Sequence, residues 1–239
     1  MIRDDIKTAF AFLTIIPTRH TPGTPARAVA YFPVVGVVIG ALLAVVASTG
    51  VLSRDVVALL VLGTWIVVTG GLHLDGFGDS CDGLLATTTP ERRLEIMRDP
   101  RAGSWAVVGL VVLLLGKWIV LRHVDPLLLV LPPVLGRWAM VLAIWSFPYA
   151  RSSGLGALFR EGLTIRHILI ATGVTAVAVF GVSLVVGGVA QIAFLLVPIL
   201  VWLVGHWAAR RLGGGLTGDV YGALCVLTEL MALIVLSRG

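Results

Sequence analysis

Long apolar stretches alternate with short polar segments along the whole chain. A hydrocarbon core about 30 Å thick needs roughly 20 apolar residues in a helix to cross it. The pattern predicts an all-α integral membrane protein, folded as a single polytopic domain over residues 1–239 with about seven transmembrane helices. The seven stretches that meet or approach the required length are 28–52, 56–72, 103–121, 126–146, 166–187, 190–209 and 219–237.

Two regions depart from this simple pattern. Before the first long stretch, Ile2, Ile6 and Phe10 recur at helical spacing, which is typical of a helix lying in the membrane interface. We therefore predict an N-terminal interfacial helix. Within the 126–146 stretch, Pro132 and Pro133 leave open a bent or re-entrant helix instead of a complete span.

The composition supports the same class of protein. Of the 239 residues, 58% are hydrophobic and 13% are charged, and the mean hydropathy is +1.01. Soluble domains have roughly 45–50% apolar and about 25% charged residues. A soluble nucleic-acid-binding protein is excluded in spite of the net charge of +5, because basic residues in membrane proteins usually set orientation. Cys81 and Cys225 lie far apart and match no disulfide or metal-site spacing.

The basic residues predict how the chain is oriented. Thirteen Lys and Arg fall on one side of the predicted spans and three on the other. Basic loops stay in the cytoplasm, so the N-terminus and the 73–102 loop are predicted to be cytoplasmic and the C-terminus external. The larger set is Arg3, Lys7, Arg19, Arg27, Arg92, Arg93, Arg98, Arg101, Arg151, Arg160, Arg166, Arg210 and Arg211; the smaller is Arg54, Arg122 and Arg238.

Three aspartates form the most informative motif. Asp75, Asp79 and Asp82 stand at i, i+4 and i+7 on one helix face, and no Lys or Arg occurs from residue 73 to residue 90. Carboxylates that repel one another are typical of a site for a hard divalent cation such as Mg²⁺. The alternative is a solvated helix end. Cys81, inside the motif, fits a packing residue better than a nucleophile.

Two further segments are suited to binding phosphate. Arg98 and Arg101 precede Gly103 at the start of a predicted span, and arginine binds phosphate oxygens bidentately. The alternative is that these arginines only set the orientation. The second segment is glycine-rich, so that backbone N–H groups can approach phosphate and its aspartate can complete a metal site. It comprises Gly213, Gly214, Gly215, Leu216, Thr217, Gly218 and Asp219.

Two charged residues are predicted to lie deep in the membrane. Arg137 and Glu229 are central in their stretches, and each charge would cost roughly 2.5–3.5 kcal/mol at mid-bilayer. We therefore expect them to share a buried polar site. Lys117 is closer to the end of its stretch, where its side chain can extend to the membrane surface.

At these residues the sequence resembles the cobalamin-5′-phosphate synthase family (adenosylcobinamide-GDP ribazoletransferase) over nearly its whole length. The specific motif is His73-Leu74-Asp75-Gly76-Phe77-Gly78-Asp79-Ser80-Cys81-Asp82-Gly83. Weaker matches are Phe12-Leu13-Thr14, Tyr31-Phe32-Pro33, Glu95-Ile96-Met97-Arg98-Asp99 and Thr217-Gly218-Asp219. The chain departs from the family at Pro100, Ala106 and Val226, where relatives often carry serine, glycine and glutamate.

The resemblance implies the last step of cobalamin nucleotide-loop assembly in a bacterial or archaeal cytoplasmic (inner) membrane. Adenosylcobinamide-GDP would react with α-ribazole or its 5′-phosphate and release GMP, with Mg²⁺ as the metal. Asp75, Asp79, Asp82 and Asp219 would hold the metal. Asp82 or His73 would accept the hydroxyl proton. Arg98 and Arg101 would stabilise the departing GMP, and the further substrate contacts would be Gly103, Thr217, Gly218, Arg137 and Glu229.

Other functions stay open at this point. A CDP-alcohol phosphotransferase or an intramembrane prenyltransferase also uses aspartate-rich motifs and Mg²⁺, but the CDP-alcohol class expects an arginine soon after Asp82-Gly83, and the chain continues Leu84-Leu85-Ala86-Thr87. A transporter would use Arg137 and Glu229 on its pathway and leaves the aspartates unexplained. The expected partners are the two substrates and membrane lipid, with a homo-oligomer left open and no nucleic acid.

Overall fold

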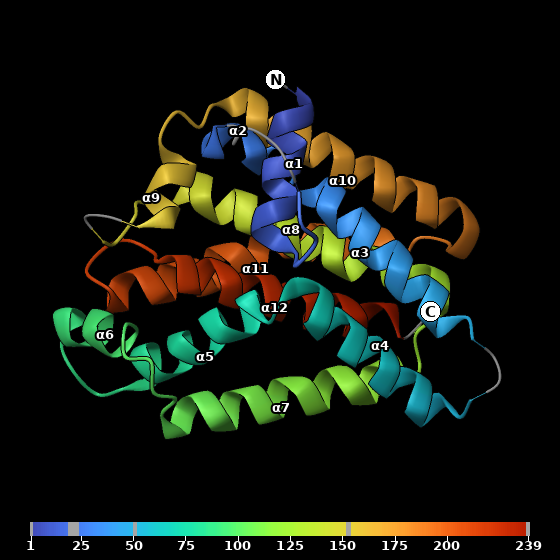
Figure 1. Ribbon diagram of the computed structural model, residues 1–239, viewed down its shortest axis with the longest axis horizontal. Coiled ribbons are helices and arrows are strands. Elements are labelled where there is room, and N and C mark those ends of the chain that lie inside the picture. The colour runs from blue at the N-terminus through green and yellow to red at the C-terminus, as the bar shows by residue number, and fades with distance from the viewer. Residues whose placement is uncertain (1, 19–23, 50–51, 152–153, 238–239) are drawn as a thin grey trace.

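Helices make up the regular structure of the described part of the chain. A computed structural model describes residues 2–18, 24–49, 52–151 and 154–237 (Figure 1). Arg19 and Arg238, which entered the orientation count, lie outside these residues. Five helices within them are long and apolar enough to cross a membrane. They are α7 (Ser104–Leu121), α8 (Leu131–Ser146) with the preceding 3-10 helix η1 (Pro126–Val130), α10 (Ile165–Val186), α11 (Val189–Arg211) and α12 (Gly218–Leu236).

A further apolar segment is broken in the middle. Helices α4 (Arg54–Thr69) and α5 (Leu72–Leu85) meet at an angle of 89° and together run from one end of the molecule to the other (Figure 1). The residues between them, Gly70 and Gly71, have φ values of 60° and 68°, a conformation that glycine adopts without strain. The predicted span 56–72 is therefore one arm of a bent pair of helices, and the predicted loop 73–102 begins with the other arm.

The predicted count of seven spans is not confirmed. The described residues contain five candidate spans, or six if the bent pair counts as one. The first predicted stretch, 28–52, forms α3 (Phe32–Ala47), an apolar helix of 16 residues. At about 1.5 Å per residue this helix is shorter than the hydrocarbon core.

Helices α8 and α12 form the centre of the bundle. Of their apolar windows 83% and 67% are buried, against 22% for α7 and 28% for α10, so that α7 and α10 present wide apolar faces outward. Pro132 and Pro133 do not interrupt α8, because they lie in its first turn, where proline removes no helical hydrogen bond. The 126–146 stretch is thus one candidate span.

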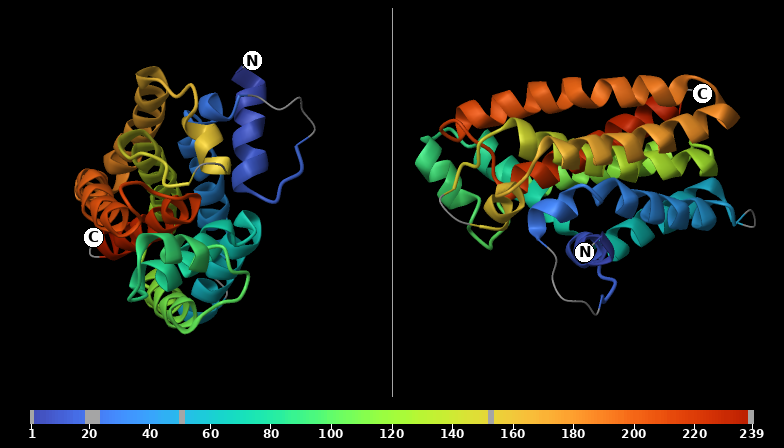
Figure 2. Two further views of the ribbon diagram at one scale, coloured as in Figure 1. Left: turned by 90° about the vertical axis from the view of Figure 1, so that its left-hand side faces the viewer. Right: turned by 90° about the horizontal axis from the view of Figure 1, so that it is seen from above.

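The N-terminal segment lies across the bundle. Helix α1 (Ile2–Leu13) is seen end-on in the right-hand view of Figure 2, beside the longitudinal α3, and buried Asp5 of α1 pairs with Arg27 of α2 (Pro25–Val29) at 3.2 Å. The predicted N-terminal helix is therefore present, and its place in a membrane interface stays a prediction. Two short helices, α6 (Pro90–Ile96) and α9 (Leu155–Arg160), lie at one end of the bundle (Figure 1).

The contact between α3 and α8 depends on small residues. A Cβ on Gly36 would lie 2.6 Å from the carbonyl oxygen of Pro133 and 2.7 Å from Cα of Val134. We expect Gly36→Ala to lower the free energy of unfolding by about 1–3 kcal/mol, because the two backbones must separate. Gly63→Ala is the matched control, since its Cβ would meet nothing within 4 Å. Thermal unfolding in detergent measures both, and equal melting temperatures would contradict the expectation.

Candidate functional site

A cavity of about 240 Å³, or about 820 Å³ with the adjoining space open to solvent, lies where α1, α3, α5, α8, α9 and α12 meet. Charged side chains line one part of it, namely Asp75, Arg151 and Asp219. Aromatic rings line another part: Phe12, Phe32, Tyr149, Phe159 and Tyr221. A cavity of this size with convergent polar groups is the usual form of a small-molecule site.

The backbones of α5 and α12 almost touch beside this cavity. A Cβ on Gly76 would lie 2.9 Å from the backbone oxygen of Asp219, so the crossing requires glycine. The close approach brings Asp219 next to the aspartates of α5. Asp75, Asp82 and Asp219 each lie close enough to Asp79 for their charges to repel it. The structure thus gathers the four predicted carboxylates in one region.

Arg151 provides a positive charge at this acidic cluster. Its Nη2 atom donates to Oδ2 of Asp219 at 2.8 Å and to the backbone oxygen of Met97 at 3.3 Å. No sequence pattern indicates this role, because Arg151 follows a predicted span and belongs only to the basic residues that predict the orientation. What distinguishes Arg151 is its position near the glycine-rich segment in the folded protein, which is not visible in the sequence.

The glycine-rich segment holds Arg151 in position. Leu216 N–H donates to the Pro148 carbonyl at 2.9 Å, and Ala150 N–H donates to the Leu216 carbonyl at 2.8 Å. Gly213 and Gly214 turn the chain with φ values of 83° and 113°, which other residues rarely adopt. The segment therefore joins residues 148–151 to the start of α12, a structural task that the phosphate-loop prediction did not include.

The two polar residues that follow have different surroundings. Thr217 is fully buried, and its hydroxyl accepts a hydrogen bond from Val220 N–H at 3.4 Å as the cap of α12. Gly218, in contrast, is exposed and lines the cavity. Of this predicted pair of substrate contacts, only Gly218 faces the space where a substrate can lie.

Asp82 has backbone partners that the sequence did not reveal. Its two carboxylate oxygens accept hydrogen bonds from Gly103 N–H at 2.7 Å and Ala106 N–H at 2.9 Å. The carboxylate thereby satisfies free N–H groups at the start of α7, where negative charge is also favoured. A Cβ on Gly103 would lie 2.6 Å from Asp82 Oδ1, so glycine there permits this cap. Asp82 is accordingly left out of the metal site proposed below.

Asparagine at Asp82 tests this capping role. We expect Asp82→Asn to lower the free energy of unfolding by about 0.5–2 kcal/mol, the usual effect of losing a helix cap, and to spare the turnover of the folded protein. Cys81→Ser on the same helix is the control, because the Cys81 thiol lies against α7, where a Cβ on Gly109 would be 2.6 Å from its Sγ atom. Thermal unfolding and turnover are measured together. Lost turnover at an unchanged melting temperature would return Asp82 to the catalytic site.

Of the two predicted phosphate-binding arginines, Arg101 lies in a separate groove and Arg98 lines neither that groove nor the cavity. Arg101 makes two hydrogen bonds to Asp99, at 2.9 Å and 2.8 Å, and holds the pKa of Asp99 at about 2. Arg101 and Gly103 line a groove of about 740 Å³ that also contains Asp82. Arg98 is exposed and does not line the 820 Å³ cavity. The structure therefore does not bring Arg98 and Arg101 to the carboxylates of the cavity.

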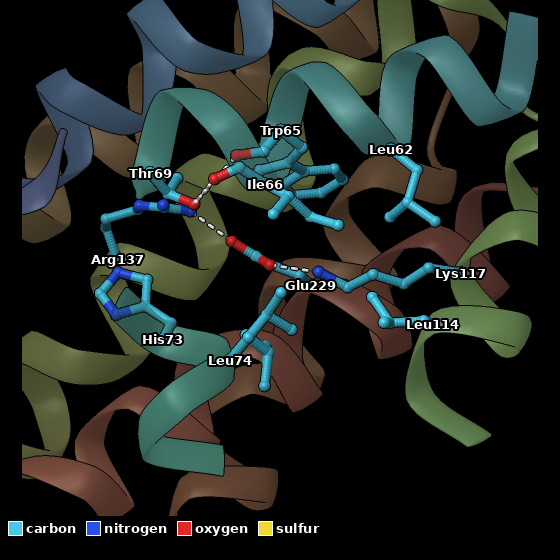
Figure 3. A pocket seen from close by; sticks show the side chains of 11 residues that line it. Leu62, Trp65, Ile66, Thr69, His73, Leu74, Leu114, Lys117, Arg137 and Glu229 are labelled. Atoms are coloured by element: carbon cyan, nitrogen blue, oxygen red, sulfur yellow. Dashed lines mark hydrogen bonds and ion pairs between the residues drawn. The ribbon is translucent and has the colours of Figure 1, made fainter. Parts of the chain in front are cut away.

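A buried cluster of charges lies deeper in the bundle (Figure 3). Arg137 forms an ion pair with Glu229, which confirms the predicted pairing. Lys117 is buried as well and pairs with the other oxygen of Glu229 at 2.5 Å; the prediction that it extends to the membrane surface was wrong. A small cavity of about 20 Å³ lies at this cluster, and His73 lines both it and the larger cavity.

The carboxylates of the cavity have the chemistry of Mg²⁺ ligands but do not form a complete metal site by themselves. No group of three His, Cys, Asp or Glu among the described residues could hold a metal ion by itself. Mg²⁺, however, is commonly bound through one or two carboxylates together with substrate phosphates and water. Asp75 and Asp219 face the cavity, and the repulsion they exert on Asp79 is relieved by a cation.

Comparisons with known proteins identify the family of the chain. The chain matches the family described as Cobalamin-5-phosphate synthase over residues 5–237. It is 42% identical to the adenosylcobinamide-GDP ribazoletransferase of Roseiflexus sp. (strain RS-1), with 97% of this chain and 88% of the relative covered. Its identity to the enzyme of the same name from Deinococcus radiodurans is 39%, with 94% and 82% covered. No solved structure matches the chain. By the extent of these matches, the chain belongs to the cobalamin-5-phosphate synthase family.

Proposed function

We propose that this protein joins adenosylcobinamide-GDP to α-ribazole, or to its 5′-phosphate, and releases GMP. The chain aligns with 88% and 94% of the length of two relatives that carry this enzyme name. The observation that carries the proposal is the cavity, which combines two carboxylates and an arginine with aromatic walls. In phosphoryl transfer a protein mainly positions the reactants and balances their charge, and these residues are suited to both.

The reaction balances as a single displacement. The ribazole hydroxyl attacks the phosphorus on the cobinamide side of the diphosphate. The bond from that phosphorus to the bridging oxygen breaks, GMP leaves, and the hydroxyl proton passes to a base. We propose that His73 or a carboxylate of the cavity takes the proton. His73 is 4% exposed, and its Nε2 atom has no hydrogen-bond partner among the described residues.

Asp75, Asp79 and Asp219 would hold Mg²⁺ in this proposal. When bound, the ion would neutralise charge on the diphosphate. Arg151 lies within 2.8 Å of Asp219, so its guanidinium both orients this carboxylate and adds positive charge beside the phosphates. The arginine therefore contributes to binding the diphosphate whether or not it contacts a phosphate oxygen directly.

The test is an assay of the purified protein in detergent. Adenosylcobinamide-GDP and α-ribazole are supplied with Mg²⁺, and chromatography follows GMP and the cobalamin product. Adding a chelator is expected to abolish GMP release. Release of CMP or pyrophosphate from other substrates would favour the rival membrane transferases, and uptake into vesicles without chemical conversion would favour a transporter.

The orientation and the lipid contacts also belong to the proposal. The wide apolar faces of α7 and α10 support contact with membrane lipid. A homo-oligomer stays a hypothesis, and the mass of the detergent-solubilised particle would test it.

Cysteine labelling tests the orientation in the inner membrane. In a Cys81→Ser, Cys225→Ser background, an impermeant thiol reagent added to intact cells is expected to label Thr49→Cys and to spare Thr87→Cys. Both positions are exposed, and the second lies among the basic loops that stay inside. Lysed cells provide the control in which both positions react. The opposite labelling pattern would reverse the proposed cytoplasmic location of the N-terminus.

A further inference from the structure

Part of the lining of the cavity is aromatic. Phe12 of α1, Phe32 of α3 and Phe159 of α9 form a ring cluster with centroid distances of 4.5 to 5.9 Å. Aromatic surfaces bind planar rings through stacked or edge-to-face contacts. The cavity is therefore suited to a ligand that has an aromatic ring at one end and a polar or charged group at the other.

Three buried polar atoms along this cavity lack partners in the described part of the chain. They are Tyr221 Oη, His73 Nε2 and Arg151 Nε. Tyr221 is only 3% exposed, so water cannot easily reach its hydroxyl from outside the cavity. Buried polar groups are normally hydrogen-bonded because leaving them unpaired is unfavourable. Unpaired atoms on a cavity wall therefore indicate a ligand that supplies hydrogen-bonding groups.

The size of the cavity selects between the two proposed substrates. Drug-sized ligands occupy pockets of about 300–1,000 Å³; the space that a small molecule can enter here is about 240 Å³, because the 820 Å³ given above includes space open to solvent. A corrin ring with its amide side chains and adenosyl group is far larger than such ligands. A nucleoside has a suitable size, a planar base and several hydroxyl groups. The nucleoside therefore fits within the cavity, and the corrinoid does not.

We infer that the cavity is the acceptor site, in which the base of α-ribazole lies against the Phe12–Phe159 wall and Tyr221 hydrogen-bonds to the nucleoside. Tyr221 is then a specificity residue for the acceptor. The corrinoid remains outside, and its diphosphate reaches the edge marked by Asp75 and Asp219. This inference rests on the proposed function and adds which substrate the cavity holds.

Tyr221→Phe tests the hydroxyl, because the substitution keeps the ring. Its KM for α-ribazole is expected to rise about 10- to 100-fold, with the KM for adenosylcobinamide-GDP unchanged. Equilibrium dialysis of α-ribazole alone should show an equal loss of affinity. Tyr31→Phe is the matched control, since Tyr31 begins α3 outside the cavity lining. Unchanged binding and KM in Tyr221→Phe would overturn the assignment.

A second pair of variants tests the aromatic wall. Phe12→Leu is expected to weaken α-ribazole binding several-fold, whereas Phe10→Leu on the same helix, which does not line the cavity, should bind normally. Equal affinity of the two variants would contradict the proposed wall. If the wild type binds α-ribazole but releases no GMP, the proposed function fails and the acceptor site stands. If GMP is released and Tyr221→Phe is unaffected, the acceptor site alone fails.

Discussion

Asp219→Asn is expected to reduce turnover by about 10²–10³-fold, the usual effect of removing one preorganised electrostatic contact from an active site. Asparagine keeps the size of the side chain, but it lacks the charge that binds a hard cation and pairs with Arg151. Raising the Mg²⁺ concentration is not expected to restore turnover, although the variant retains Arg151, because the missing ligand belongs to the protein. GMP release by the purified variant measures the effect.

The control for this variant is Asp55→Asn. Asp55 also pairs with an arginine, Arg122 at 2.5 Å. This pair is half exposed and lies at the start of α4, the end farther from α5. Exposed ion pairs contribute about 0–1 kcal/mol, so neither stability nor turnover should change appreciably. Full turnover in Asp219→Asn, in a sample that melts like the wild type, would exclude the proposed metal site.

The largest expected effect on stability comes from Glu229→Gln. The buried glutamate accepts contacts from two cations, Arg137 and Lys117, which are 0% and 3% exposed. Removing one partner of a buried ion pair typically costs about 3–5 kcal/mol, because the remaining charge has no compensation. The substitution leaves two such charges. We expect a large fall in folded yield and in melting temperature, measured on the solubilised protein.

The cluster carries one more positive than negative charge, so its members should respond unequally. Lys117→Met is expected to be milder than Glu229→Gln, because Arg137 and Glu229 remain as a balanced pair. Combining Lys117→Met with Glu229→Gln should destabilise less than the sum of the two single changes. Glu95→Gln serves as the control, since its pair with Arg92 is exposed. Equal losses in the two buried single variants, or strict additivity, would contradict the coupling.

Much of the fold could be predicted because the membrane imposes simple rules on sequence. Helix is the conformation that satisfies its own backbone hydrogen bonds in lipid, so apolar length identified the candidate spans. The count of seven spans is not confirmed, because apolar length carries no information on where a segment bends. Gly70 and Gly71 break one segment through their backbone angles, and an apolar pattern does not show whether adjacent glycines turn the chain or continue the helix.

The candidate site could be predicted where its residues share one helix face or where an isolated charge in lipid requires a partner. Asp75 and Asp79 follow from spacing alone, and the pairing of Arg137 with Glu229 follows from the free-energy cost of an isolated charge in lipid. The prediction for Lys117 was wrong because the distance of a residue from the helix end does not show which side chains of other helices it contacts. The roles proposed for Tyr221 and Arg151 could not be predicted, since neither residue belongs to a motif of catalytic or metal-binding residue types.

The sequence by itself determined the class of protein, the helical face that carries the aspartates and the need for a buried partner to Arg137, because these depend on local periodicity and on the cost of polar groups in lipid. Only the tertiary structure decided which carboxylates remain available to the cavity. Asp82 caps α7 and Asp219 reaches the cavity because α5 docks against the start of one helix and crosses another at Gly76. Such contacts depend on how distant helices pack, which no local pattern specifies.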